Sequence, residues 1–268
     1  MRYTEVKIFN SLKNEEIIEE YKKTGLVVIK NNQNLSIREY MNIAKNFSKE
    51  IGDGTLHEHP MYPSLEGSND LIVHLKKEPN ETINTGNNWH ADETWLEYPI
   101  SGSLILAKKL PPVGLGNTYW INSNDAYENL SEQTRTYLEN TRCVHGCRHK
   151  FLSLDDPQLN VFDEKRDVMH PAIINHPLQN KKSLFVNNEF CFRFEGKTVE
   201  ESKPIFDEIN DAYMKAYETK HYCHVWDVGD MVFWDDRSYW HRAENDYNGY
   251  LREMWRISIT PKKEKLTG

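Results

Sequence analysis

The feature that most constrains this chain is a pair of histidine-bearing segments separated by more than half of its length. The first is Trp89-His90-Ala91-Asp92. If it is extended, as the residues after it suggest, His90 and Asp92 point the same way, about 6.6 Å apart. An imidazole nitrogen and a carboxylate oxygen can then converge on one metal ion, but two ligands do not make a site. The best third candidate is His241, so the fold has to bring residue 241 beside residues 90–92.

Two histidines and one carboxylate on one face of a metal ion are the ligands of non-haem Fe(II) oxygenases, whose sites keep open positions. The alternative for an isolated His-x-Asp is a surface pair without metal. The neighbours of this motif favour the metal site over the surface pair. We therefore predict that His90, Asp92 and His241 form a catalytic metal triad.

Two other clusters look like metal ligands. His57 and His59 lie in a segment with two prolines and no third ligand nearby, which favours a loop that faces the substrate. The segment Cys143–His149 holds two cysteines and two histidines, and its cysteine spacing is tolerated by zinc. No second ligand pair follows at finger spacing, so the segment favours a strand with mixed faces over a zinc site.

Composition excludes several classes of protein. A chain of 268 residues fits one large domain or two small ones, and 38% hydrophobic residues suffice for a core. The formal net charge of -8, without a basic block, argues against a nucleic-acid partner. No apolar run approaches the ~20 residues of a membrane span. The first residues lack a secretory signal, and four cysteines are no disulfide framework. We expect a soluble cytoplasmic protein with free thiols and no membrane partner.

Short strands joined by tight turns, with helices early and before the last strands, predict a mainly β jelly roll (double-stranded β-helix) with flanking helices. The alternative is an α+β sandwich of another topology. No linker is evident, so residues 1–268 form a single domain, whose opening α-β-α segment (about 1–52) packs outside the main sheet. The expected helices are 14–24, 37–52, one that Asn124 or Ser131 caps and that runs to about Asn140, and one that begins with a capping box at Thr198. The expected strands are 26–29, 71–75, 102–107, 118–121, hairpins 172–176/183–187 and 224–227/231–235, and 251–260.

The closing strand carries two arginines on one face. Arg252 and Arg256 share the even positions, whereas the odd positions are apolar apart from Glu253. The strand alone favours sending both arginines to solvent. The alternative places them inside the barrel, where a buried guanidinium needs an anion and binds a carboxylate through paired hydrogen bonds. With a metal triad beside the strand, a pocket that binds an acid is favoured.

At this point the residues match a known family. The chain resembles the taurine catabolism dioxygenases, the TauD/TfdA group of Fe(II)/2-oxoglutarate oxygenases, over nearly its whole length. The matching pieces, in order and spacing, are His59-Pro60-Met61-Tyr62-Pro63, Asn88-Trp89-His90-Ala91-Asp92, Gly116-Asn117-Thr118, His170-Pro171, Leu184-Phe185-Val186-Asn187, Trp234-Asp235-Asp236-Arg237, and His241 followed by Asp246-Tyr247, Arg252 and Arg256.

This resemblance implies a double-stranded β-helix and assigns roles to residues. By resemblance, the triad holds Fe(II), and Thr118 and Arg252 hold the distal carboxylate of the co-substrate 2-oxoglutarate, with O2 as the oxidant. Residues that match His59 and Arg256 hold the substrate sulfonate in taurine-oxidising members, with Tyr62 close by.

Two positions depart from the family pattern. Gly86 stands where an asparagine helps to hold the taurine amine, and Glu93 follows the iron-binding aspartate in place of a small apolar residue. Glu93 either meets a cation of the substrate or points to solvent, and both remain open. The expected substrate is a small acidic molecule, a sulfonate or an amino-acid-like carboxylate, that differs from taurine at its other end.

The expected reaction oxidises, and by default hydroxylates, this substrate with release of succinate and CO2. Desaturation or multi-step oxidation on the same scaffold is an alternative. A non-catalytic metal-binding sensor would not need both Thr118 and Arg252, and a zinc hydrolase would have no use for the 2-oxoglutarate grip. Assembly into a homo-oligomer stays open.

Overall fold

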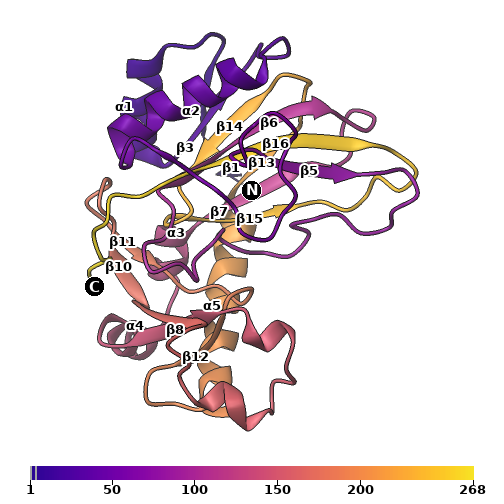
Figure 1. Ribbon diagram of the computed structural model, residues 1–268. Coiled ribbons are helices and arrows are strands. Elements are labelled where there is room, and N and C mark those ends of the chain that lie inside the picture. Colours follow the sequence, from indigo (N-terminus) through magenta and orange to yellow (C-terminus); the bar gives the residue numbers. More distant parts are fainter. Residues whose placement is uncertain (1, 4) are drawn as a thin grey trace.

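Two β-sheets form the centre of the molecule (Figure 1). The structure is a computed structural model that describes residues 2, 3 and 5–268; residues 1 and 4 of the predicted opening segment lie outside the described residues. The larger sheet has seven strands in the order β2-β3-β14-β6-β16-β4, with β5 also paired to β16. Its strands are β2 (Lys7–Phe9), β3 (Leu26–Ile29), β14 (Met231–Trp234), β6 (Gly102–Lys109), β16 (Arg252–Ile259), β4 (Leu56–His57) and β5 (Val73–Lys77).

The smaller sheet has four strands in the order β1-β13-β7-β15. These are β1 (Arg2–Tyr3), β13 (Lys220–His224), β7 (Thr118–Asn122) and β15 (Tyr239–Ala243). An apolar cluster joins the two sheets, because Trp120 of β7 and Tyr239 of β15 pack with Trp234 of β14 and Met254 of β16. The pocket described below opens between the sheets beside this cluster.

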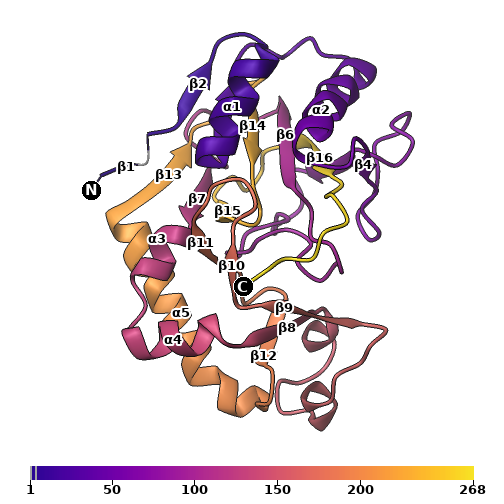
Figure 2. The ribbon, with the colours of Figure 1, turned by 90° about the vertical axis from the view of Figure 1, so that its left-hand side faces the viewer.

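Two helices cover the outer face of the larger sheet (Figures 1 and 2). They are α1 (Asn14–Thr24) and α2 (Ile37–Ile51), which begins with the predicted Ser36–Glu39 capping box. Tyr21 and Phe47 stack on Phe233, with ring centroids 3.9 and 4.9 Å away. These helices lie outside the sheet as predicted, but strand 26–29 does not. It is β3, paired with both β2 and β14, because its four residues are buried on both faces.

A second group of elements lies below the smaller sheet (Figure 1). The long helix α5 (Val199–Thr219) stacks Tyr213 on Trp240 of β15 at 3.6 Å between ring centroids. Around it lie α3 (Ser123–Glu128), α4 (Glu132–Glu139), the short helices η1 (Arg148–Lys150) and η2 (Pro157–Asn160), the sheet of β12 (Cys191–Phe194), β8 (Arg142–Gly146) and β9 (Asp167–Pro171), and the hairpin of β10 (Ile173–Asn175) and β11 (Lys182–Leu184). Among the described residues no helix is long and apolar enough to cross a bilayer.

The helix predicted to run to about residue 140 is confirmed with the Ser131 cap: it is α4, and its C-terminal cap is Asn140. The shorter α3 before it is capped by Asn122, not by Asn124.

One prediction of local structure was wrong. The hairpin 224–227/231–235 does not form, because β13 and β14 belong to different sheets. Asp230 holds the turn between them: it accepts hydrogen bonds from Lys30 at 2.8 Å and from the backbone of Asp227 at 3.0 Å, and it contacts His224 Nε2 of β13 at 2.9 Å.

Candidate active site

Three segments bring the predicted triad together. His241 lies on β15, and His90 pairs with it as a single β-bridge, with backbone N–O distances of 3.1 and 2.8 Å. Asp92 follows in a turn, so the prediction that this segment is an extended strand was wrong. The chain leaves the extended conformation at Glu93, whose φ of 52° is left-handed. The bridge fixes the two histidines side by side, and the turn brings the carboxylate back toward both.

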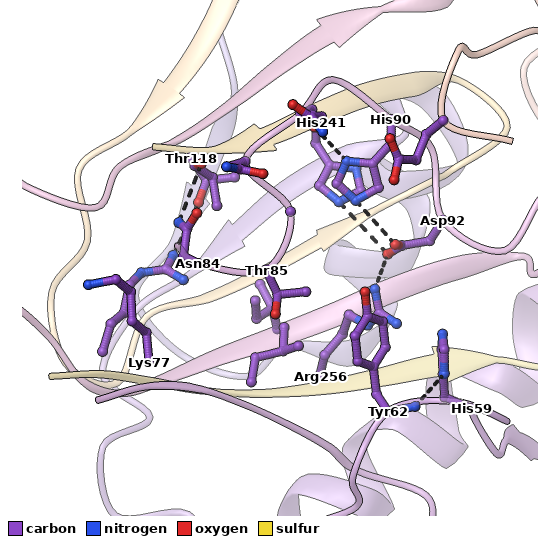
Figure 3. A pocket seen from close by; sticks show the side chains of 18 of the residues that line it. His59, Tyr62, Lys77, Asn84, Thr85, His90, Asp92, Thr118, His241 and Arg256 are labelled. Atoms are coloured by element: carbon purple, nitrogen blue, oxygen red, sulfur yellow. Dashed lines mark hydrogen bonds and ion pairs between the residues drawn. The ribbon is translucent and has the colours of Figure 1, made fainter. Parts of the chain in front are cut away.

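The ligand atoms of the triad converge at one end of a pocket (Figure 3). Asp92 Oδ1 lies 3.5 Å from His90 Nε2, and Asp92 Oδ2 lies 3.8 Å from His241 Nε2. One ligand atom from each residue lies within 4.8 Å of the others. Two imidazoles and one carboxylate at this spacing are a donor set that suits Fe(II).

A hydrogen bond at His90 and burial at His241 favour the form of each ring that binds a metal. The Nδ1 of His90 lies 2.8 Å from the carbonyl oxygen of Asn88 and can donate its proton there, which leaves the Nε2 lone pair facing Asp92. Burial, together with the neighbouring His90, lowers the pKa of His241 well below its usual range. A neutral imidazole is the form that a metal requires.

Asp92 lies between a cation and a second carboxylate. Burial raises its pKa, but Arg256, whose Nη1 is 2.5 Å from Asp92 Oδ2, and His241 outweigh burial and hold this pKa well below the ordinary value. Behind it, Asp236 accepts hydrogen bonds from the backbone of Asp92 at 3.0 Å, Trp234 Nε1 at 2.9 Å and Ser103 Oγ at 2.8 Å. Burial and the charge of Asp92 raise the pKa of Asp236. Asp236 is thus a positioning residue for the turn, and sequence reasoning missed it.

The pocket's other end holds the pair expected to bind 2-oxoglutarate. Thr118 Oγ1 lies 3.4 Å from Arg252 Nη2 and accepts a hydrogen bond from Trp226 Nε1 at 3.0 Å. Arg252 and Arg256 are only 6% and 5% exposed, so the reading that sends both to solvent was wrong. It failed because both faces of β16 are buried: the apolar odd face packs in the core under α1 and α2, and on the even face both arginines line the pocket.

His59 and Tyr62, the other residues expected to bind the substrate, also line the pocket. His59 Nδ1 accepts hydrogen bonds from the backbone N–H groups of Met61 and Tyr62, both at 3.2 Å, and the two rings lie 4.7 Å apart. Burial lowers the pKa of His59. His59 therefore presents a neutral ring whose Nε2 faces the interior, 3.9 Å from Glu93 Oε1.

Glu93 occupies neither of its predicted places. It is 1% exposed, which excludes the solvent alternative, and it is not among the residues that line the pocket. Its carboxylate accepts a hydrogen bond from Ser258 Oγ at 2.9 Å and lies 2.7 Å from His57 Nε2, at ion-pair distance without hydrogen-bond geometry. Arg256 Nη2 is a further 3.5 Å contact. Protein groups therefore occupy the place that a substrate cation was expected to take.

Gly86, the other departure, lies directly against the triad. Its φ is 79°, and its carbonyl accepts a hydrogen bond from the Ala243 backbone at 2.8 Å. A Cβ at this position would lie 3.3 Å from His90 Cε1 and 3.8 Å from His90 Nε2. The missing side chain thus leaves room beside the metal-facing edge of His90.

The predicted Cys143–His149 cluster does not assemble as spaced in the sequence. Cys143 and His145 lie on β8, as predicted for a strand, and their third neighbour is Cys191. The sulfur of Cys191 is 3.3 Å from His145 Nδ1, which also contacts Thr94 Oγ1 at 3.0 Å. Burial raises the pKa of Cys143 and lowers that of His145, so both favour their neutral forms in the core.

Two facing sheets with imidazoles and a carboxylate converging between them define a class of protein, the double-stranded β-helix with a metal-ligand triad. The profile of the "Taurine catabolism dioxygenase TauD, TfdA family" matches residues 2–258. The chain therefore belongs to this family, as its sequence motifs predicted.

Relatives in sequence agree with this assignment, and a solved structure has the same fold. The chain is 29% identical over 218 residues to an alkylsulfatase of Acinetobacter baylyi, covering 77% of this chain and 65% of the relative. It is 25% identical over 226 residues to an alpha-ketoglutarate-dependent sulfate ester dioxygenase of Pseudomonas putida, covering 80% and 71%. A putative alpha-ketoglutarate-dependent taurine dioxygenase from Burkholderia xenovorans has a similar fold, with a TM-score of 0.76, 21% identity and coverage of 100% and 93%. This likeness confirms the predicted single-domain double-stranded β-helix over the alternative α+β topology.

Proposed function

We propose that the protein is an Fe(II)- and 2-oxoglutarate-dependent dioxygenase that hydroxylates a small acidic molecule and releases succinate and CO2. One observation carries the proposal: a single pocket holds the convergent triad at one end and Arg252 with Thr118 at the other. Arg252 is buried there and forms no ion pair with a carboxylate of the described residues. A metal site alone would need only the first end. A 2-oxoacid that binds a metal and carries a distal carboxylate needs both.

Each part of the pocket has a task in this reaction. His90, Asp92 and His241 would hold Fe(II), which supplies, with 2-oxoglutarate and O2, the oxidation of an unactivated C–H bond. Thr118 and Arg252 would orient the co-substrate through its distal carboxylate, because a guanidinium binds a carboxylate in a fixed geometry. Trp95 and Phe190, whose rings pack 4.3 Å apart on the pocket wall, would exclude water from the reacting centre.

The acidic substrate class rests on a different part of the wall. His59, Tyr62 and Arg256 line it together. The named activities of an alkylsulfatase and a sulfate ester dioxygenase among the relatives favour a sulfate ester or sulfonate, and an amino-acid-like carboxylate fits the same groups. Glu93 needs no cation from the substrate, because His57, Ser258 and Arg256 already enclose it.

The test is succinate release by the Fe(II)-loaded protein with 2-oxoglutarate and O2 over a panel of alkyl sulfates, alkyl sulfonates and amino acids. A substrate should raise succinate above the level without substrate, and its products together should contain one oxygen atom more than the substrate, also where a hydroxylated sulfate ester or sulfonate breaks into two products. Loss of two hydrogens instead would favour the desaturation alternative. Omission of Fe(II) and the Asp92→Ala variant are the controls.

Two other outcomes would replace the proposal. Tight metal binding without 2-oxoglutarate binding would favour a sensor. Hydrolysis of a panel member without consumption of 2-oxoglutarate would favour a zinc hydrolase.

The proposal extends to location and partners. Four free cysteines, two of them buried against each other, fit the reducing cytoplasm. We expect no nucleic-acid partner for a chain of net charge -8, and leave its assembly as a monomer or homo-oligomer to light scattering. Binding to a nucleic-acid column at physiological salt would contradict the expectation of no nucleic-acid partner.

A further inference from the structure

Lys77 at the end of β5 is a buried cation with no anion beside it. It is 3% exposed and lines the pocket. Among the described residues its ammonium makes no hydrogen bond and no ion pair, and its only close partner is the ring of Tyr247, 4.6 Å from Nζ.

Strand pairing places Lys77 beside Arg252. The two residues are direct partners in the antiparallel register of β5 and β16, so their side chains leave the sheet on the same face. The Arg252 guanidinium lies 6.0 Å from the same Tyr247 ring. Figure 3 shows Lys77 with Asn84 and Thr118 at the end of the pocket opposite the triad.

No carboxylate of the described residues lies within ion-pair distance of either cation. Asp246, whose charge acts on Arg252 from beyond that distance, instead accepts a hydrogen bond from the Gly116 backbone at 2.7 Å. Lys109 of the neighbouring β6 differs: its side chain is 60% exposed, and its ammonium lies 2.8 Å from Glu253. Burying a charge without a partner is costly, so two such cations side by side indicate a place for an anionic ligand.

We propose that Lys77 and Arg252 together bind the distal carboxylate of the 2-oxoacid, and that Lys77 makes the pocket selective for dicarboxylic 2-oxoacids. This inference rests on the proposed function. Arg252 supplies a planar fork for one or both oxygens, and Lys77 supplies a point charge from the neighbouring strand. Thr118 Oγ1 completes the polar group around the carboxylate.

The test is calorimetric titration of the anaerobic, Fe(II)-loaded full chain with 2-oxoglutarate and with 2-oxopentanoate, which has the same chain length but lacks the distal carboxylate. Lys77→Met keeps the length of the side chain without its charge. It should weaken 2-oxoglutarate binding about tenfold or more, as expected for a hydrogen bond to a charged group, and leave 2-oxopentanoate binding unchanged. Lys77→Arg should retain selectivity. Lys109→Met is the matched control and should bind both ligands as wild type does.

A second readout needs no co-substrate. Because Lys77 is an uncompensated buried charge, metal-free and ligand-free Lys77→Met should melt at or above the temperature of the wild type. A lower melting temperature would mean that Lys77 serves the fold and would overturn the proposal, as would equal weakening of both 2-oxoacids or an unchanged 2-oxoglutarate Kd.

The design separates this inference from the function on which it rests. If wild type binds no 2-oxoglutarate, the proposed function fails. If wild type binds it, Arg252→Ala weakens it and Lys77→Met does not, the function stands and the role of Lys77 is wrong. Lys77→Gln provides a second neutral variant should Lys77→Met fail to fold.

Discussion

The two ends of the pocket hold their charges differently. At the triad end, Arg256 lies between Asp92 and Glu93, at 2.5 and 3.5 Å, so cation and carboxylates compensate one another before any ligand binds. At the far end, Arg252 and Lys77 have no carboxylate within ion-pair distance among the described residues. The triad end is a balanced site that a cation can join, and the far end is an unbalanced site that needs an anion.

One strand supplies both arginines, so the difference comes from what faces them. Arg252 and Arg256 are four residues apart on the pocket face of β16. In the register of that strand Arg252 meets Lys77, whereas Arg256 meets the apolar Val73 and reaches across to the turn after His90. The charges that face each guanidinium therefore decide whether it balances carboxylates of the protein or can bind an anionic ligand.

The largest loss should follow removal of a metal ligand at the balanced end. His241→Ala deletes one of three converging ligand atoms and leaves no unpaired charge, because burial holds the pKa of His241 low enough to keep it neutral. Turnover should fall by more than about 100-fold. Removal of a residue that only hydrogen-bonds to a metal ligand already costs up to about 100-fold, and removal of the ligand itself should cost more. Succinate release and Fe(II) binding measure it. His74→Ala, at a β5 histidine that contacts Glu253 at 3.1 Å, is the control, and full turnover in His241→Ala would remove the metal assignment.

The next effect should appear in stability. Arg256→Ala leaves Asp92 and Glu93 buried without their cation, so the free energy of unfolding of the metal-free protein should fall by about 3–5 kcal/mol. Denaturation in urea measures this, and Arg256→Lys should lose less because it keeps the charge. Substrate binding should weaken as well, and 2-oxoglutarate binding far less. An Arg256→Ala variant as stable as the wild type would show that Arg256 does not compensate the charges of Asp92 and Glu93.

Arg252→Ala should have the opposite pattern to Arg256→Ala: a large loss of 2-oxoglutarate binding and no loss of stability. Loss of a charge-assisted contact worth about 1.5–3 kcal/mol should raise the 2-oxoglutarate Kd by about 10–150-fold. Stability without ligand should not fall, because no carboxylate loses its partner. Titration and urea denaturation on the same samples give both numbers. Destabilisation as large as in Arg256→Ala would erase the contrast between the two ends.

Local signals were enough to predict much of this architecture. Residues close together in the sequence determine the limits of α1 and the capping boxes of α2 and α5, and the structure confirms these predictions. The triad could be proposed because His90 and Asp92 are two residues apart. The enclosure of Glu93 could not be predicted, because Ser258 and Arg256 lie far along the chain and only the complete fold brings their side chains to it.

Lys77 shows which signal was available and not used. Val73, Leu75 and Lys77 alternate onto one face of β5, and the first two are apolar, so the period of the strand already placed the lysine inward. The strand was predicted two residues early, at 71–75, which ended it before Lys77. Prediction of β3 outside the sheet and of a β13–β14 hairpin failed for a related reason, since strand partners are set by long-range packing.

The smallest effect, and the finest probe of the triad end, is expected at Gly86. Gly86→Ala places a methyl group 3.3 Å from His90 Cε1 and also strains a backbone with φ of 79°. Gly196→Ala carries the same kind of strain at φ of 74° with no atom within 4 Å of the new Cβ. Both variants should lose about 1 kcal/mol of stability from the left-handed backbone. Only Gly86→Ala should also weaken Fe(II) binding, by about tenfold, because the methyl group displaces a metal-ligand ring. Metal titration of the two variants separates the steric contact with His90 from the backbone strain that both share. Equal Fe(II) affinities would mean that the His90 ring can shift without weakening metal binding.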